Sequence, residues 1–306
     1  MLKKIRVSEI NRRREKRTES RRRRIAEYMI TLAAGAIMIA LCTIGISASK
    51  KYDFPKNAVE VSVTLDGRRV LEGEAAIIDD VTYVPLRAFS ELMGAESIEW
   101  DQSSRIATVK KYNMTAKISE NSSYIEASGR YFKLTSPLKN INDRLFLPIR
   151  VAAKMFSAEV DWNADSRTVL LKNTNKAFIR GADFYSSEDL YWLSRIISAE
   201  AKGESLAGKI AVGNVVLNRV ESKNYPNTVY GVIFDRKHGT QFSPVAIGTI
   251  YDTPTTESII AAKICLEGYT LSDAVLFFMN PRISTNNWIA KNRPFAFRIG
   301  NHDFYY

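Results

Sequence analysis

The sequence predicts a multidomain protein with an N-terminal transmembrane helix, two small β-rich α+β repeats and a mainly helical C-terminal domain. Three observations predict this. An uncharged run follows a strongly basic segment, a stretch in the middle of the chain occurs twice, and helical periodicity begins near Leu190. The expected pieces are a basic cytoplasmic segment at 1–27, a membrane anchor at 28–48, repeats at 58–111 and 112–173, a linker at 174–186 and a last domain at 187–306.

The positive charge is concentrated at the N-terminus. Residues 1–27 contain twelve Lys or Arg and four Glu, which gives +8 of the formal net charge of +11 and leaves +3 for the other 279 residues. A nearly neutral body offers no basic surface to a nucleic acid. The basic segment is therefore interpreted as a topology signal, and no nucleic-acid partner is expected.

The run from Tyr28 to Ala48 carries no charge. As a helix it would be roughly 30 Å long, which matches the hydrocarbon core of a bilayer. A basic flank before such a span places the N-terminus in the cytoplasm and everything after about Lys50 outside. We expect an uncleaved anchor in the cytoplasmic membrane; the alternative is a cleaved signal peptide and secretion, because small residues end the run.

The middle of the chain is duplicated. Residues 81–111 match residues 144–173, and the pairs Pro85/Pro148, Arg87/Arg150 and Trp100/Trp162 fall at equivalent places. Each copy predicts a hairpin, a short strand that ends in Pro, one helix and a second hairpin. The first hairpins turn at Asp66-Gly67 and Ser128-Gly129, and the helices are expected at 86–93 and 149–156.

Both copies resemble the small repeated domain named after the N-terminal domain of copper amine oxidases. The "PLRAF…W" and "PIRVA…W" cores carry the resemblance. It implies an extracellular attachment module, with a wall polymer or a protein as partner. Neither copy supplies a cluster of metal ligands, so no copper is expected. For Trp100, Trp162, Arg87 and Arg150, we expect core packing and strand pairing.

The C-terminal domain opens with an amphipathic helix. Leu190, Leu193, Ile196 and Ile197 share one apolar face, and Glu200 follows on the same side near the helix end. A carboxyl on a buried side is costly when ionised, so burial raises its pKa and suits it to general acid catalysis. A surface Glu remains the alternative from spacing alone. Gly203 is expected to end the helix.

Several short blocks follow one another over about the last 120 residues: "AEAKGE", "VGNVVLNRV", "PNTVYGVIF", "QFSPVAIG", "FFMNP", "NNWI" and a closing "IGNHDFYY". In content and order these blocks resemble the cell wall hydrolase family of the spore cortex-lytic enzyme SleB. The resemblance implies a lysozyme-like fold, peptidoglycan glycan strands as substrate and Glu200 as the catalytic acid. Cleavage would fall between N-acetylmuramic acid and N-acetylglucosamine.

Other residues of these blocks are candidates for substrate binding: Glu204, Gln241, Phe242, Asn280 and Trp288. Core packing is the alternative for Phe242 and Trp288, and a helix N-terminal charge or cap is the alternative for Glu204. Asn218 is expected to be a buried polar brace and His302 a hydrogen-bonded structural residue. No metal or cofactor is expected, because the two histidines match no metal spacing, and Cys42 and Cys265 predict no disulfide.

The chemistry leaves alternatives open. A single acid suffices when the muramyl C6 hydroxyl attacks C1, which is lytic transglycosylation to a 1,6-anhydromuramyl product. A hydrolytic muramidase would use Glu204 or Asp252 to place a water. A catalytically inert wall-binding protein is the non-enzymatic alternative. Repeats and a basic anchor stand where cortex-lytic enzymes commonly carry a different binding domain, so a role in the vegetative wall competes with one in the spore cortex.

Overall fold

The computed structural model describes residues 52–306 except 238 and 286. The predicted basic segment and the predicted membrane anchor lie outside these residues, so both stay predictions. Within 52–306, none of the described helices combines the length and the apolar character that crossing a membrane requires.

The first copy of the repeat contains the predicted elements in the predicted order. They are the hairpin β2 (Ser62–Leu65) and β3 (Arg68–Val70), the strand β5 (Val81–Pro85), the helix α2 (Leu86–Leu92), and the hairpin β6 (Ser97–Asp101) and β7 (Ile106–Lys111). The short strands β1 (Val59–Glu60) and β4 (Ala76–Ile78) complete it.

The second copy repeats this order with the same number of strands and one helix. Its elements are β8 (Met114–Ser119), β9 (Tyr124–Ala127), β10 (Arg130–Lys133), β11 (Lys139–Ile141), β12 (Arg144–Pro148), α3 (Ile149–Met155), β13 (Ala158–Asn163) and β14 (Thr168–Asn173). In both copies the first hairpin turns through two residues with positive φ: Asp66 and Gly67 at 51° and 81°, Ser128 and Gly129 at 44° and 85°. These are the values that a type I′ turn requires.

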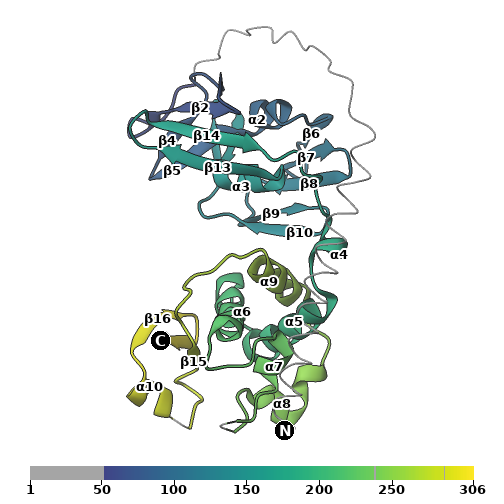
Figure 1. Ribbon diagram of the computed structural model, residues 1–306, viewed down its shortest axis with the longest axis vertical. Coiled ribbons are helices and arrows are strands. Elements are labelled where there is room, and N and C mark those ends of the chain that lie inside the picture. The colour runs from purple at the N-terminus through teal and green to yellow at the C-terminus, as the bar shows by residue number, and fades with distance from the viewer. Residues whose placement is uncertain (1–51, 238, 286) are drawn as a thin grey trace, which may run out of the picture. The chain divides into compact units, whose positions relative to one another are not determined.

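The two copies are merged into one β-rich body (Figure 1). β5 of the first copy pairs antiparallel with β12 of the second, and β14 of the second pairs parallel with β2 of the first. A third sheet runs β10-β9-β8-β7-β6 and joins both copies. One apolar core includes Phe89 and Val109 from the first copy and Leu147 and Met155 from the second.

The expectation of core packing is wrong for the two repeated tryptophans. Trp100 is 42% exposed and Trp162 is 36% exposed. Each lies on an outer hairpin, paired with Ala107 or Val169 across the strands. Arg87 of α2 and Arg150 of α3 are also exposed, so these repeated positions lie on the surface of the β-rich body.

The C-terminal domain is mainly helical, as expected, but it also contains a small sheet. Its helices are α4 (Gly181–Phe184), α5 (Ser187–Ala201), α6 (Leu206–Glu221), α7 (Val229–Ile233), α8 (Ser243–Ile247), η1 (Thr249–Tyr251), α9 (Thr256–Leu266) and α10 (Trp288–Asn292). The sheet, which was not predicted, has the order β15 (Phe277–Met279), β17 (His302–Tyr305), β16 (Phe295–Ile299).

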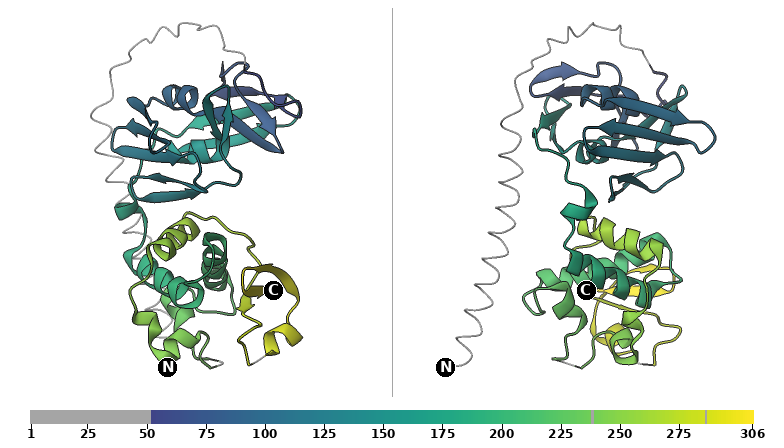
Figure 2. Two further views of the ribbon diagram at one scale, coloured as in Figure 1. Left: turned by 180° about the vertical axis from the view of Figure 1, so that it is seen from behind. Right: turned by 90° about the vertical axis from the view of Figure 1, so that its right-hand side faces the viewer.

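Helices α5, α6 and α9 lie side by side and enclose the second core (Figure 2). Ser186 caps α5 and Ser205 caps α6, each by accepting a backbone N–H through its side chain. Gly213 of α6 gives room to Ile197 of α5 and Cys265 of α9, because a Cβ there would lie 2.8 Å from each. The close approach of these helices positions the end of α5, where Glu200 lies.

Candidate active site

Glu200 lies in the last turn of α5, next to a fully buried apolar face. Ile196 and Ile197, one turn earlier, are 0% exposed, and Glu200 itself is only partly exposed. Among the residues that the structure describes, none forms a hydrogen bond or ion pair with the Glu200 carboxyl. A carboxyl that is neither paired nor freely solvated is disfavoured in its charged form.

Burial raises the pKa of Glu200 from 4.5 to about 7. No neighbouring charge contributes clearly to this change; loss of water around the carboxylate is the cause. A carboxyl that exchanges its proton near neutral pH can act as both general acid and general base.

Glu204 has a different environment. Its side chain is 8% exposed, and its carboxylate accepts two hydrogen bonds from one residue, from Asn301 Nδ2 to Oε1 at 2.9 Å and from the Asn301 backbone N–H to Oε2 at 3.3 Å. His302 Nδ1 lies 3.7 Å from Oε1. The carboxylate is thus occupied by groups of the protein, whereas sequence analysis leaves it open between substrate binding, placing a water and a helix-terminal role.

Phe242 and Gln241 lie at the start of α8. Phe242 is 3% exposed and packs on Phe278, with ring centroids 6.3 Å apart, so core packing describes it. Gln241 is half-buried, and its side chain donates to the Gly239 carbonyl at 3.2 Å.

Asn280 and Trp288 lie on the segment that follows β15. The Asn280 Oδ1 accepts from the Arg282 backbone N–H at 3.0 Å, and the Arg282 guanidinium donates to Asn301 Oδ1 at 3.3 Å. Asn280 is therefore linked to Glu204 through Arg282 and Asn301. Trp288 is 49% exposed, so core packing does not account for it. The Arg293 guanidinium lies over its ring, 5.5 Å from the ring centroid.

Two other expectations concern polar groups in the core. Asn218 is the brace that was predicted: its Nδ2 donates to the carbonyls of Ser272 and Val275 at 2.9 and 2.8 Å. His302 is 6% exposed, but its buried Nδ1 has no hydrogen-bond partner, so the expectation of a hydrogen-bonded histidine is wrong for that atom. Burial lowers the pKa of His302, against the opposing effect of the Glu204 and Asp303 carboxylates.

Sequence analysis missed Asn301 and a cluster of aromatic rings on α5. Trp192 contacts the rings of Tyr191, Tyr230, Phe234 and Tyr251 at centroid distances of 4.8 to 6.2 Å. The three tyrosines are 44–61% exposed. Trp192 lies eight residues before Glu200 on the same helix, and this position was the available signal. For Asn301 the signal was the preceding Gly300, whose φ is +58°.

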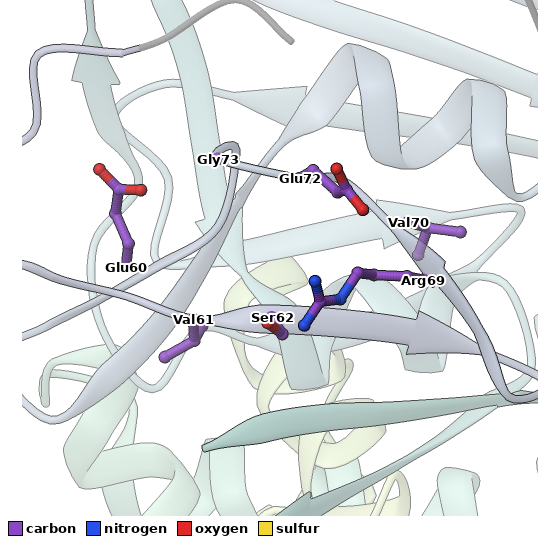
Figure 3. Close-up of a pocket in the computed structure, with 7 residues that line it drawn as sticks. All are labelled: Glu60, Val61, Ser62, Arg69, Val70, Glu72 and Gly73. Atoms are coloured by element: carbon purple, nitrogen blue, oxygen red, sulfur yellow. The ribbon is translucent and has the colours of Figure 1, made fainter. Parts of the chain in front are cut away.

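A shallow pocket in the β-rich body is drawn in Figure 3. Its lining comes from β1, β2, β3 and the loop that follows: Glu60, Val61, Ser62, Arg69, Val70, Glu72 and Gly73. Glu60, Arg69 and Glu72 are exposed to solvent. We assign no chemistry to it.

Comparisons with known proteins support the same division of the chain. Residues 203–305 match the family model described as Cell Wall Hydrolase, and residues 64–171 match the one described as Copper amine oxidase N-terminal domain. The second match covers both copies of the repeat.

The curated relatives are spore cortex-lytic enzymes. Those of Bacillus cereus and Halalkalibacterium halodurans are 38% identical over 120 residues, and that of Bacillus subtilis is 37% identical over the same length. The match takes in 39% of this chain in each case, and 45%, 35% and 38% of these relatives respectively. The chain thus spans less than half the length of the curated relatives it matches.

Two solved structures also match. The catalytic domain of the germination-specific lytic transglycosylase SleB from Bacillus anthracis is 37% identical, with 40% of this chain and 97% of that chain covered and a TM-score of 0.37. The catalytic domain of the Bacillus cereus SleB protein is also 37% identical, with 40% and 92% covered and a TM-score of 0.36. From the family matches, the protein carries a C-terminal cell wall hydrolase domain preceded by a copper amine oxidase N-terminal domain.

Proposed function

We propose that the chain is a peptidoglycan glycosidase and that Glu200 is its catalytic acid. The observation that carries this proposal is the environment of Glu200: a partly buried carboxyl without a partner, with its pKa raised to about 7, on a helix end of the hydrolase domain. The curated relatives are cortex-lytic enzymes, which supports the same substrate class.

The reaction we propose is lytic transglycosylation between N-acetylmuramic acid and N-acetylglucosamine. Glu200 donates its proton to the glycosidic oxygen as the bond to C1 breaks, so N-acetylglucosamine leaves with a free hydroxyl. The ionised Glu200 then takes the proton of the muramyl C6 hydroxyl while that oxygen bonds to C1. The acid is regenerated, no water is consumed and the product is a 1,6-anhydromuramyl end.

The environments of the other carboxyl groups decide whether the mechanism uses one acid or two. Hydrolysis normally uses a second carboxyl that activates a water or attacks the sugar. Glu204 is held by Asn301, and Asp252, the other residue considered for placing a water, is exposed. Both features favour the single-acid route, and hydrolysis by a muramidase remains the competing outcome of the experiment below.

We further propose that the anchor at 28–48 keeps the enzyme on the outer face of the cytoplasmic membrane. The β-rich body would hold a wall polymer or a wall protein. The near-neutral charge beyond residue 27 supports a neutral or mixed-charge partner over a nucleic acid.

The test is digestion of purified peptidoglycan by the full chain in mild detergent, followed by mass spectrometry of the products. Glu200→Gln should lower the rate by roughly 10²–10⁴-fold, the usual contribution of a general acid. The matched control is Glu221→Gln, an exposed glutamate at the end of α6, which should behave like the wild type. Equal rates for Glu200→Gln and wild type would reject the assignment. Products with reducing muramic ends would show that the reaction is hydrolysis and not transglycosylation. Absence of digestion by the wild type would favour the inert wall-binding protein.

A further inference from the structure

The segment that follows Glu200 is tied to three different elements. The Glu204 backbone N–H donates to the Ala201 carbonyl at the end of α5, at 3.0 Å. The Glu204 carbonyl accepts from the Nζ of Lys209, a side chain of α6 that is 2% exposed. The Glu204 carboxylate binds Asn301 in the turn between β16 and β17.

The turn at 299–302 is shaped around this carboxylate. Gly300 has φ +58°, and a Cβ at this position would collide with the Glu204 carboxylate. Asn301 follows at once and points both its backbone N–H and its side-chain amide at the two carboxylate oxygens. Hydrogen bonds to an ionised acceptor are stronger than neutral ones, and burial strengthens them further.

The contact continues beyond the turn. Asn301 Oδ1 accepts from the Arg282 guanidinium, and the Arg282 backbone N–H donates to Asn280 Oδ1. β15, which ends one residue before Asn280, pairs with β17, which begins one residue after Asn301. Glu204 therefore connects the last turn of α5, where Glu200 lies, through its backbone N–H, to the β16–β17 turn of the small sheet, through its carboxylate.

We propose that Glu204 is a positioning residue for the reaction, which rests on the function proposed above. Its carboxylate fixes the β16–β17 turn and the segment at Asn280 relative to Glu200. On this proposal Glu204 contacts neither the sugar nor the attacking group. It acts on kcat, because a displaced acid loses alignment with the glycosidic oxygen.

The chain allows an exchange of donor and acceptor that tests the contact. In Glu204→Gln, the new side-chain NH2 group faces a hydrogen-bond donor of Asn301 in either orientation of the Gln amide: the side-chain Nδ2 in one and the backbone N–H in the other. In Asn301→Asp two carboxylates face each other. In the double variant Glu204→Gln/Asn301→Asp, the Gln amide donates to the Asp carboxylate and the Gln oxygen accepts from the backbone N–H of residue 301. Both hydrogen bonds are restored with the roles of the side chains exchanged.

The measurement is kcat and KM of the full chain on soluble glycan strands, with kcat expressed per folded molecule from thermal unfolding. Each single variant should lower kcat about 10- to 100-fold with KM changed less than about threefold. The double variant should recover most of the lost kcat, which gives a large coupling in the double-mutant cycle. Glu221→Gln again serves as the unaffected control.

Three outcomes would overturn the proposal. The first is a wild-type kcat per folded molecule in the single variants. The second is a double variant that recovers none of the lost kcat. The third is a rise in KM at unchanged kcat, which would show that Glu204 contacts the substrate. A wild type without activity on any glycan would instead overturn the proposed function, and the positioning role would fall with it.

Discussion

At the scale of single residues, Glu200 and Glu204 are four positions apart and differ in what surrounds the carboxylate. The Glu204 carboxylate accepts two hydrogen bonds, both from Asn301. Glu200 has no such donors among the described residues, and burial alone raises its pKa to about 7. The first arrangement is typical of a structural anchor, and the second is suited to an acid that must release and regain a proton.

The pH dependence of activity follows from this value. A general acid must be protonated when the substrate binds, and Glu200 is protonated below a pKa of about 7. We therefore expect kcat/KM to fall about tenfold per pH unit above roughly pH 7. The measurement is a profile of kcat/KM from pH 5 to 9 on soluble glycan strands. A profile that already falls about tenfold per pH unit from pH 5 upward, with no plateau below pH 7, would point to an acid with an ordinary pKa.

Because the Glu200 carboxyl is partly buried, its ionised form should lower the free energy of unfolding of the protein. Because the folded-state pKa is raised, the contribution of this group to stability is fully present below pH 4.5 and is lost as the pH rises through about 7. Glu200→Gln removes the charge, so it should raise the free energy of unfolding at pH 8 by roughly 1–3 kcal/mol and have little effect at pH 4.5. Urea unfolding at both pH values measures this, with Glu221→Gln as control. Equal effects at the two pH values would contradict it.

At the scale of elements, local patterns predicted more than contacts between distant segments. Helices α2 and α3 begin at the predicted residues, and each ends one residue before the predicted end. The duplicated Pro and the Gly turns determine these elements locally. The pairing of β14 with β2 joins residues about a hundred positions apart, as Val169 and Val63 do, and no periodicity shows which strands meet.

The site divides in the same way. Spacing along one helix face made Glu200 a candidate, with a surface Glu as the alternative, and the resemblance of the surrounding blocks to the cell wall hydrolase family selected it. Both signals are local in the sequence. The partner of Glu204 lies 97 residues further on, so the sequence could not separate an anchor from a binding residue. Gly203 shows the limit of a local rule: it follows the helix end as predicted, but it lacks the positive φ that makes Gly favourable there.

The packing of α5, α6 and α9 gives a prediction at this scale. Gly213→Ala would bring a methyl group within 2.8 Å of both Ile197 and Cys265, which are side chains of the buried core. We expect the free energy of unfolding to fall by about 1–3 kcal/mol. The control is Gly203→Ala, where no atom lies within 4 Å of the new methyl group. Urea unfolding compares the two, and equal stability of both variants would contradict the tight packing of these three helices.

At the scale of residues 52–306, contacts join the second copy of the repeat to the hydrolase domain. Arg130 of β10 forms a bidentate ion pair with Glu267 at the end of α9, at 2.7 and 2.8 Å. The side chains are 13% and 5% exposed. The Tyr185 hydroxyl donates to Glu267 at 2.7 Å, and Lys263 donates to the Gly129 carbonyl at 3.1 Å. The hairpin β9–β10 is therefore bonded to α9.

Removing one partner of a buried ion pair is costly, because it leaves the other charge without compensation. Arg130→Met should lower the stability of the contact by about 3 kcal/mol or more, whereas Arg130→Met/Glu267→Leu should recover much of it. Limited proteolysis between residues 174 and 180, together with urea unfolding, measures the effect. We expect Arg130→Met alone to be cleaved faster and to unfold in two separate steps. The control is Arg87→Met, whose pair with Glu91 is 53% and 59% exposed and should contribute less than about 1 kcal/mol. If Arg130→Met resists protease and unfolds as the control does, the Arg130–Glu267 ion pair does not hold the two domains together, and the remaining contacts of α9, such as Lys263 with the Gly129 carbonyl, must do so.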